Sequence, residues 1–421
     1  MAVCLLMFLS QAVSGQTYLW KDSASLLHRQ LVVTTAPQSL VEIRIDRPAT
    51  GIAIEYADKA EMKGSFAWDE QISYPVTHNS HVEHMAISDL ILFPGPVTSF
   101  FLYNHSAMNP VTIHLIYAPE IQLEQLPAEA LLGEDTTNCA KPPSVDQSVW
   151  RAGLPEPKGF VAYNDVEHII VHHTATANST TDHLQAVRNI YLYHTEVNGW
   201  DDVGYNYLIA QDGTIYNGRD GRGALDDDDT KGAHFCAKND ATMGISMIGT
   251  FNDGLPPDTA LRALTQLMAW KINKDALNVM TVSMHPRNSP NATPLKTISG
   301  HRDGCPTECP GDSLFAIIGA LSLEVEALSS ACIPPANAGT GDHTESDISI
   351  YPQPAGNYIF IKTTFTEPYV CVLYDATGRQ LKSGILNSDV SWLSLEGLPA
   401  GIYFLEVRTD KEWVKTLVVK G

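Results

Sequence analysis

The stretch HIIVHHTAT, from His168 to Thr176, places an uninterrupted apolar run directly before two adjacent histidines. A short apolar run of this kind is typical of a buried strand, so the histidines are expected at the strand's carboxyl end. Neighbouring side chains of a strand point to opposite faces of the sheet. Only one of His172 and His173 can therefore face a given site, and the pattern alone does not say which.

Helix and strand patterns alternate on the C-terminal side of this stretch. Apolar spacing predicts a helix over residues 181–197, which Asn198 and Gly199 end, and an amphipathic helix over residues 258–278. Further strands are predicted at residues 205–209, 214–216 and 243–249. Interleaved helices and strands predict an α/β domain, a mixed β-sheet flanked by helices, over residues 136–332.

Two β-rich segments flank this domain. Residues 16–135 alternate apolar and polar side chains, as in Val41–Asp46 and Val111–Tyr117, which predicts half-buried strands in an all-β, sandwich-like domain. Residues 347–421 repeat short apolar runs between turns and predict a small β-sandwich. Small and helix-breaking residues mark 333–346 as the linker before it.

The N-terminus is typical of an exported chain. Residues 1–15 hold a short apolar run followed by small residues, which predicts a signal peptide cleaved before Gln16. No later segment is expected to span a membrane. The chain has 27 Lys and Arg against 48 Asp and Glu, a formal net charge of −21. This charge argues against nucleic acid and anionic lipid as partners.

The segment SGHRDGCPTECPG, from Ser299 to Gly311, combines histidine and cysteine in a loop rich in glycine and proline. Such a loop can bring the imidazole of His301 and the thiolate of Cys309 to one metal ion, and zinc accepts both. A strand histidine as third ligand would leave a fourth position for water, as catalytic zinc sites require. A Cys305–Cys309 disulfide, an iron–sulfur site or a structural zinc site are alternatives at this point.

Tyr205 is expected where a strand begins after a tight loop. A phenol in this place could hydrogen-bond a metal-bound water or a developing oxyanion. A half-buried strand tyrosine without a chemical role is the alternative.

Together these motifs resemble the zinc-dependent N-acetylmuramoyl-L-alanine amidases of the type-two group, which share a fold with the peptidoglycan recognition proteins. The resemblance covers residues from about 145 to about 330 and rests on VHHTAT, YHTEVNGW, DVGYNYLI, QDGTIYNGRD, GAH, MGISMIGTF and SGHRDGCPTECPG. It implies a zinc hydrolase that cleaves the amide between N-acetylmuramic acid and the L-alanine of the stem peptide.

The resemblance also implies roles for individual residues. The zinc ligands would be His172 rather than His173, with His301 and Cys309. The catalytic partners would be Tyr205 and Thr307, and the candidate substrate contacts are His173, Trp200 and His234. Relatives that lack the ligand cysteine typically bind wall fragments without cutting them, so the presence of Cys309 favours an enzyme.

The remaining cysteines and acids lead to further expectations. Family geometry brings Cys236 close to Cys305, which predicts a disulfide between them. A second disulfide, Cys139–Cys332, would join the two ends of the domain and leave Cys371 unpaired in the core of the last domain. Two polar clusters, His78 with His81 and His84, and Asp226–Asp229, are expected to be solvated loops. The alternative for the histidines is metal binding, and the alternatives for the acidic run are a calcium loop or a substrate-selecting rim.

The C-terminal segment resembles the sorting domain of cargo of the type IX secretion system of Bacteroidetes-like bacteria. The matching motifs are IYPQPA at 350–355, VLYDATGR at 372–379, LPAGIYFL at 398–405 and VKTLVVK at 414–420. The resemblance implies export through the periplasm of a Gram-negative cell to its surface or the medium, with the secretion machinery as a partner. A generic carbohydrate-binding or fibronectin-like sandwich is the alternative.

Two other functions compete with the peptidoglycan amidase. One is a non-catalytic peptidoglycan-binding protein on the same fold, and the other is a surface adhesion protein whose zinc site is structural. The chain is expected to be a monomer.

Overall fold

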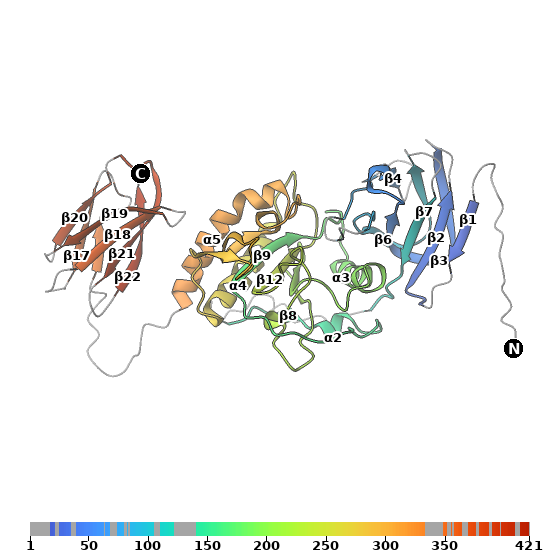
Figure 1. Cartoon of the computed structure of the whole chain (residues 1–421), viewed down its shortest axis with the longest axis horizontal. Coiled ribbons are helices and arrows are strands. Elements are labelled where there is room, and N and C mark those ends of the chain that lie inside the picture. Colours follow the sequence, from blue (N-terminus) through green and yellow to red (C-terminus); the bar gives the residue numbers. More distant parts are fainter. Residues whose placement is uncertain are drawn as a thin grey trace. The chain divides into compact units, whose positions relative to one another are not determined.

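The computed structural model describes most of residues 17–121, all of residues 140–332 and most of residues 348–420 (Figure 1). The undescribed positions inside the first and last of these ranges are 22–24, 35–38, 63, 68–73, 80–81, 83–84, 105–109, 352–354, 356–357, 364–368, 376–378, 387–389, 396 and 409–412. The predicted signal peptide (1–15) and linker (333–346) lie outside the described residues. The chain forms two compact units, residues 1–332 and residues 333–421.

Residues 17–121, here called the N-terminal β-region, form one seven-stranded sheet in the order β1-β2-β7-β3-β6-β4-β5. The strands are β1 (Thr17–Lys21), β2 (His28–Thr34), β3 (Ser39–Glu55), β4 (Gly64–Ala67), β5 (Tyr74–Pro75), β6 (Ile91–Asn104) and β7 (Val111–Ile116), all paired antiparallel. In β3, Val41 and Ile43 are buried whereas Glu42 and Arg44 are exposed, as the period-two pattern predicts. The expected β class is confirmed, although as one continuous sheet in which the long strand β3 pairs with both β6 and β7.

The central α/β domain is built on a six-stranded sheet in the order β15-β9-β12-β10-β11-β8. Its strands are β8 (Ser144–Val145), β9 (His168–His173), β10 (Tyr207–Ile209), β11 (Ile215–Asn217), β12 (Thr242–Met247) and β15 (Ile298–Gly300). Only the β10–β11 pair is antiparallel, so the sheet is mixed, as expected. Every residue of β9 is buried because β9 lies between two parallel neighbours and both faces of the sheet are covered.

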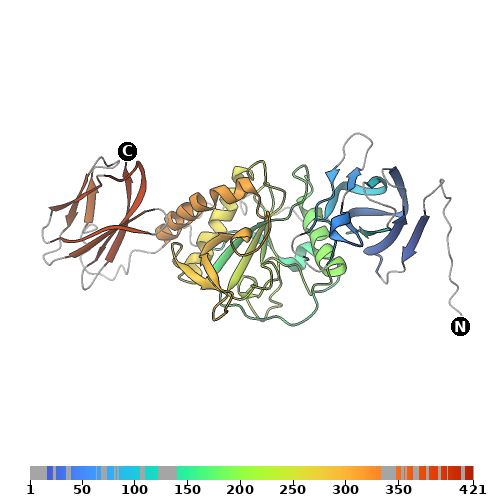
Figure 2. The same ribbon diagram turned by 45° about the horizontal axis from the view of Figure 1, so that its top comes forward.

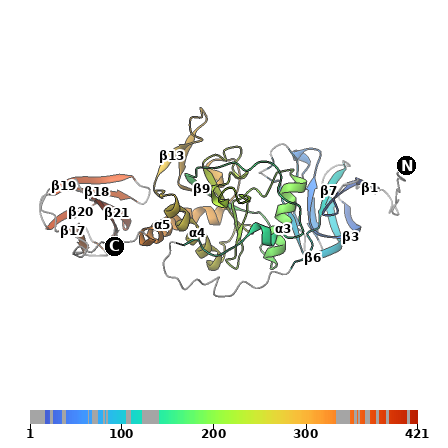
Figure 3. The same ribbon diagram turned by 90° about the horizontal axis from the view of Figure 1, so that it is seen from below.

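Helices cover both faces of this sheet (Figure 2). They are α2 (Gln147–Trp150), α3 (His183–Leu192) with its π-helical continuation η2 (Tyr193–Val197), α4 (Asp258–Lys274) and α5 (Asp312–Cys332). Helices α4 and α5 share a core with β9, β10 and β12, whereas α3 packs on the opposite face. A hairpin of β13 (Val282–His285) and β14 (Thr293–Lys296) projects from the domain (Figure 3).

The N-terminal β-region and the central domain share one hydrophobic core across α3. Ala53, Leu92 and Ile116 of the sheet pack in the same cluster as Ile190 and Tyr191 of α3. Polar contacts add to this packing, since the Thr50 hydroxyl donates to the side-chain oxygen of Asn189 over 2.6 Å. Both regions belong to one compact unit, residues 1–332, and the predicted domain boundary between residues 135 and 136 lies outside the described residues.

Helix α5 differs from one expectation. By length and composition alone, its segment Asp312–Ser330 is apolar enough to cross a membrane, whereas the sequence was expected to hold no such segment. Its residues Leu314, Ile318, Leu321 and Val325 recur every three or four positions and are buried against α4 and the sheet. This is the pattern of a core helix with one buried face.

The run Asp226–Asp229 is not simply solvated. The Nζ atom of Lys271, on α4, contacts carboxylate oxygens of Asp228 at 2.5 Å, Asp229 at 2.6 Å and Asp275 at 2.7 Å, and its side chain is fully buried. The Nζ atom of Lys274 pairs with carboxylate oxygens of Asp226, Asp228 and Asp229 at 2.8–3.0 Å. Two lysines thus pair with three of the four acids of the run, which gives it a structural role in place of the solvated loop expected.

The second unit is a small β-sandwich, as the sequence predicts. One sheet has the order β16-β17-β20 and the other β19-β18-β21-β22. The strands are β16 (Ile348–Tyr351), β17 (Tyr358–Thr363), β18 (Tyr369–Asp375), β19 (Gln380–Leu386), β20 (Val390–Ser394), β21 (Gly401–Arg408) and β22 (Trp413–Lys420). Ile359 and Ile361 of one sheet pack with Leu373 and Leu405 of the other, and the Cys371 thiol is buried between them.

Candidate metal centre and its cleft

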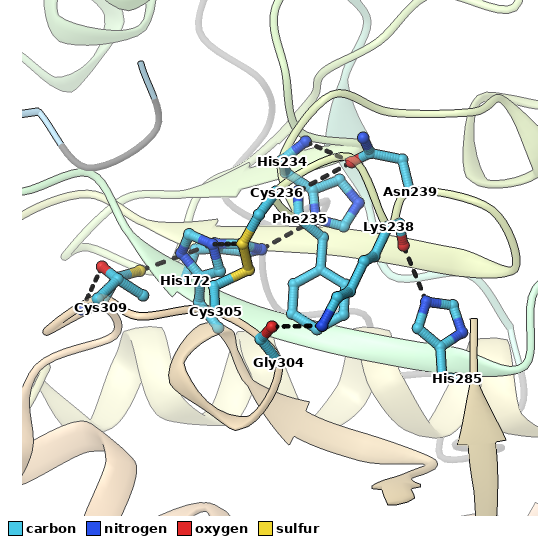
Figure 4. The surroundings of a disulfide bond; sticks show 12 residues. His172, His234, Phe235, Cys236, Lys238, Asn239, His285, Gly304, Cys305 and Cys309 are labelled. Carbon is cyan, nitrogen blue, oxygen red and sulfur yellow. Dashed lines mark hydrogen bonds between the residues drawn. A yellow bond between two sulfur atoms is a disulfide. The ribbon is translucent and has the colours of Figure 1, made fainter. Parts of the chain in front are cut away.

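His172 lies at the carboxyl end of β9 and is completely buried. Its Nε2 atom is 3.0 Å from Nδ1 of His234, and its Nδ1 atom is 3.7 Å from Sγ of Cys309 (Figure 4). The ring of His301 lies 4.5 Å away, centroid to centroid. His173 points elsewhere, since its Nδ1 atom accepts a hydrogen bond from the Phe251 backbone at 3.3 Å. Of the two histidines, His172 is therefore the one grouped with His301 and Cys309, as the resemblance implied.

The segment His301–Gly311, here called the ligand loop, begins at the end of β15. It is closed on itself, because the Arg302 N–H donates to the Cys309 carbonyl at 3.1 Å and the Cys305 N–H donates to the His301 carbonyl at 3.2 Å. Gly311 has φ +94°, and a Cβ there would lie 2.3 Å from the Phe251 backbone, so only glycine fits. The loop is thus held against the chain that follows β12, with Cys309 facing β9.

His172, His301 and Cys309 fit a zinc ion. One ligand atom from each lies within 4.8 Å of the other two. Zn–N and Zn–S bonds of about 2.0 and 2.3 Å at a tetrahedral angle separate the two donors by about 3.6 Å, close to the 3.7 Å between His172 Nδ1 and Cys309 Sγ. Two imidazoles and a thiolate suit zinc rather than magnesium or calcium, which take oxygen ligands. Burial raises the pKa of the Cys309 thiol, so metal binding has to displace its proton.

The predicted Cys236–Cys305 disulfide is present, with Cα atoms 6.2 Å apart (Figure 4). It links the segment after His234 to the ligand loop, and Cys236 Sγ lies 3.9 Å from His301 Nε2. Cys305 is therefore not bonded to Cys309, which keeps its thiol. The proposed partner pair Cys139–Cys332 lies outside the described side chains.

Tyr205 and Thr307 border the cleft beside the three candidate ligands. The Tyr205 ring lies 5.2 Å from that of His172, centroid to centroid. Burial, with a smaller contribution from Cys309, raises the pKa of Tyr205, so its phenol keeps its proton. The Thr307 hydroxyl oxygen accepts a hydrogen bond from the Cys309 N–H at 3.1 Å, which ties Thr307 to the backbone of a candidate ligand.

The three candidate substrate contacts have different positions. His173 borders the cleft. His234 is only 2 % exposed and lies behind His172, with its Nε2 atom 3.4 Å from the Thr242 hydroxyl. Trp200 packs on the ring of His194, centroids 4.6 Å apart. Among the described residues, neither His234 nor Trp200 lines the cleft, so His234 is placed to orient His172 rather than to touch substrate.

The cleft has a volume of about 620 Å³, within the range of ligand-binding pockets. One wall is the loop after β9 with α3, η2 and the ligand loop, and the other comes from the N-terminal β-region through Thr77–Asn79 and Asp89–Leu92. Asp89 was not found from the sequence, because no motif marks it and 83 positions separate it from His172. Burial, opposed by a hydrogen bond from Thr77, raises the pKa of Asp89 to about 7. His78, expected to be solvated, also borders the cleft, whereas His81 and His84 lie outside the described residues.

The central domain is similar to proteins of a known family. The N-acetylmuramoyl-L-alanine amidase family model matches residues 162–312. Peptidoglycan recognition protein 1 of Bos taurus is 35% identical over 156 residues, which are 36% of this chain and 70% of the relative. The Mus musculus protein of that name is 34% identical and covers 45% of this chain and 91% of the relative. The Drosophila structure "PGRP-LB wild-type" is similar over 42% of this chain and 92% of that one, with 31% identity and a TM-score of 0.33.

A second family model, the secretion system C-terminal sorting domain, matches residues 349–420, which form the β-sandwich of the second unit. The sorting domain indicates secretion to the cell surface or the medium in Bacteroidetes. Together with the 70% and 91% coverage of two relatives at or above 34% identity, these matches establish the family. The chain belongs to the family of N-acetylmuramoyl-L-alanine amidases and peptidoglycan recognition proteins, and it carries a C-terminal sorting domain for secretion.

Proposed function

We propose that this chain is a zinc-dependent amidase that hydrolyses the amide between N-acetylmuramic acid and the L-alanine of the peptidoglycan stem peptide. The observation that carries the proposal is the convergence of His172, His301 and Cys309 beside an open cleft. Three protein ligands are the number found in catalytic zinc sites, because one position has to stay available for water or substrate.

A zinc ion held by these residues would polarise the scissile carbonyl and lower the pKa of water towards neutrality. The protein's own side chains then orient the reactants. The protonated phenol of Tyr205 holds the attacking water, and the Thr307 hydroxyl donates to the oxygen that gains negative charge as water adds to the lactyl carbonyl. One such donor is worth about 3 kcal/mol of barrier lowering. The carbon–nitrogen bond breaks, and the amine of L-alanine leaves with a proton from the water.

A second candidate is binding of peptidoglycan without cleavage. It is favoured by relatives that are named recognition proteins and match this chain at 34–35% identity. On this hypothesis the same cleft holds a wall fragment and leaves its amide intact. The complete His172, His301 and Cys309 set supports the enzyme over this candidate.

We also propose that the chain crosses the periplasm after removal of a signal peptide and leaves the cell through the type IX secretion system as a monomer. The match of residues 349–420 to a secretion sorting domain supports this route.

Digestion of purified peptidoglycan by the zinc-loaded full chain tests the proposed activity. The amidase predicts new L-alanine amino termini, released stem peptides, and loss of both after treatment with a chelator. A folded, zinc-loaded sample that binds several wall types and releases no stem peptide would support the recognition function and contradict the amidase.

A further inference from the structure

The N-terminal β-region has no assigned role, yet it forms part of the cleft that is lined by Cys309, one of the three candidate metal ligands. Its Thr77–Asn79 and Asp89–Leu92 segments face the loop after β9 and the ligand loop across the same cavity. The cavity is therefore incomplete in the α/β domain alone. The shared cleft means that the N-terminal β-region is positioned to contact whatever the metal centre acts on.

Hydrogen bonds attach this wall of the cleft to η2 of the α/β domain. The Asn79 side chain donates to the Tyr193 hydroxyl at 2.7 Å, and that hydroxyl donates to the Ser88 carbonyl at 2.6 Å. Tyr193 belongs to η2 and borders the cleft itself. These hydrogen bonds are buried, and one of them holds Ser88, the residue directly before Asp89, so they fix the position of Asp89 relative to η2.

The Asp89 carboxylate is presented to the cavity by a second pair of contacts. Its Oδ2 atom accepts from the Thr77 hydroxyl at 2.9 Å, and its N–H donates to the Thr77 carbonyl at 2.9 Å. Among the described residues, its other carboxylate oxygen accepts no hydrogen bond from the protein. The negative charge of Asp89 also contributes to the raised pKa values of Tyr193, Tyr205 and Cys309, which places it within electrostatic reach of the centre of the site.

The chemistry of the cavity disfavours an anionic ligand. Its described lining contains two carboxylates, Asp89 and Glu308, and no lysine or arginine. The other polar groups include hydroxyls, amides and imidazoles, from residues such as Thr174, Asn178 and Asn252. A stem peptide brings free carboxylates, whereas a glycan chain of N-acetylated sugars is neutral and rich in hydroxyl donors. A carboxylate with an open oxygen is a strong acceptor for such hydroxyls.

We propose that the N-terminal β-region forms a glycan-binding wall of the cleft, in which Asp89 accepts hydrogen bonds from sugar hydroxyls and Ile91 packs against a sugar ring. The inference deepens the proposed function, because it assigns the sugar part of peptidoglycan to this wall. The stem peptide then lies away from the two carboxylates. A chain without this wall would hold its substrate through the α/β domain only.

Binding of a peptide-free probe tests the wall independently of catalysis. The metal-free full chain is titrated with a tetramer of N-acetylglucosamine, and binding is followed by calorimetry. Asp89→Asn is expected to weaken binding by about tenfold or more, as loss of a hydrogen bond to a charged group implies. The matched control is Asp165→Asn, which removes the same charge from an exposed position of the α/β domain.

Equal affinity of wild type and Asp89→Asn for the tetramer, or no binding by the wild type, would overturn the proposal. A variant that keeps the tetramer but loses a lysine-terminated stem peptide would also overturn it, because Asp89 would then bind an amine. None of these outcomes depends on cleavage, so failure of the amidase and failure of the glycan wall are separate results. If the chain is an amidase, Asp89→Asn should raise KM more for a disaccharide-linked substrate than for a sugar-free lactyl-peptide.

Discussion

The imidazole of His234 lies directly behind that of His172, with Nδ1 of the former 3.0 Å from Nε2 of the latter. This contact fixes which nitrogen of His172 is available, because the other nitrogen, Nδ1, then faces Cys309 Sγ. Partners of this kind hold a metal-binding imidazole in one orientation and one tautomer. His234 of the GAH motif is thus placed to hold the candidate ligand His172 in one orientation.

His234→Ala should weaken zinc binding by about 10- to 100-fold without removing a ligand. Loss of a group that hydrogen-bonds the second ring nitrogen of a ligand histidine lowers metal affinity by this amount. Competition with a chromophoric chelator measures the affinity. His183→Ala, at the first position of α3, is the matched control and should bind zinc like the wild type. An unchanged affinity in His234→Ala would show that β9 and the ligand loop orient His172 on their own.

Cys309→Ala should abolish both zinc binding and amide hydrolysis, because two imidazoles alone form an incomplete site. Zinc per chain, measured by elemental analysis after dialysis, should fall from about one to near zero. Cys371→Ala removes the other buried thiol, in the second unit, and should keep its zinc. Retention of zinc by Cys309→Ala would refute its assignment as a ligand.

The Cys236–Cys305 disulfide should stabilise the first unit by about 4 kcal/mol, the chain-entropy value for its sequence separation of 69 residues. The double variant Cys236→Ser/Cys305→Ser should unfold at lower urea concentration and bind zinc more weakly, because the bond holds the ligand loop that carries His301. A reducing agent should shift the wild type to the same midpoint and leave the double variant unaffected. If the reducing agent leaves the urea midpoint of the wild type unchanged, the other contacts of the ligand loop are enough to hold it without the disulfide.

Lys271→Met should destabilise the first unit by about 3–5 kcal/mol, since removing one partner of a buried ion pair leaves the other charge uncompensated. The partner most affected is Asp228, whose side chain is 3 % exposed. Lys274→Met is the control, because Lys274 also contacts Asp228 and Asp229 but its side chain is 26 % exposed, so its loss should cost less. Urea unfolding followed by tryptophan fluorescence compares the free energies of unfolding of the two variants. Equal losses of stability would contradict the idea that the buried lysine matters more than the partly exposed one.

The sequence predicted the elements and most of the site correctly where the signal was local. The apolar run of β9, the glycine-rich ligand loop and the resemblance together singled out His172, His301 and Cys309, which the structure brings within 4.8 Å. Features that depend on packing between distant segments were missed. Nothing in the sequence near Asp89 shows that it lines the same cleft as Cys309, because this placement depends on how the N-terminal sheet packs on α3. The lysine partners of Asp226–Asp229 were missed for the same reason, since they lie on a helix more than 40 residues away.

Asp89→Asn should stabilise the first unit at pH 8 and have little effect near pH 4. Burial, acting first, and the charge of Glu308 raise the pKa of Asp89 from 3.8 to about 7 in the folded chain. The folded state therefore holds a proton that the unfolded state has lost between about pH 4 and pH 7, so stability falls as pH rises through this window. Asparagine does not titrate, and the variant avoids this loss.

The difference is measured as Tm of the metal-free variant minus Tm of the metal-free wild type, at pH 4, 6 and 8. It should grow with pH to about 2 °C or more, the shift that 1 kcal/mol produces in a domain of this size. Asp165→Asn, exposed and outside the cleft, should show no such trend. A half-buried carboxylate that lowers stability at neutral pH is expected where binding requires it, as at a site for sugar hydroxyls. A pH-independent difference would show that the Asp89 carboxyl is solvated in the cleft and titrates normally.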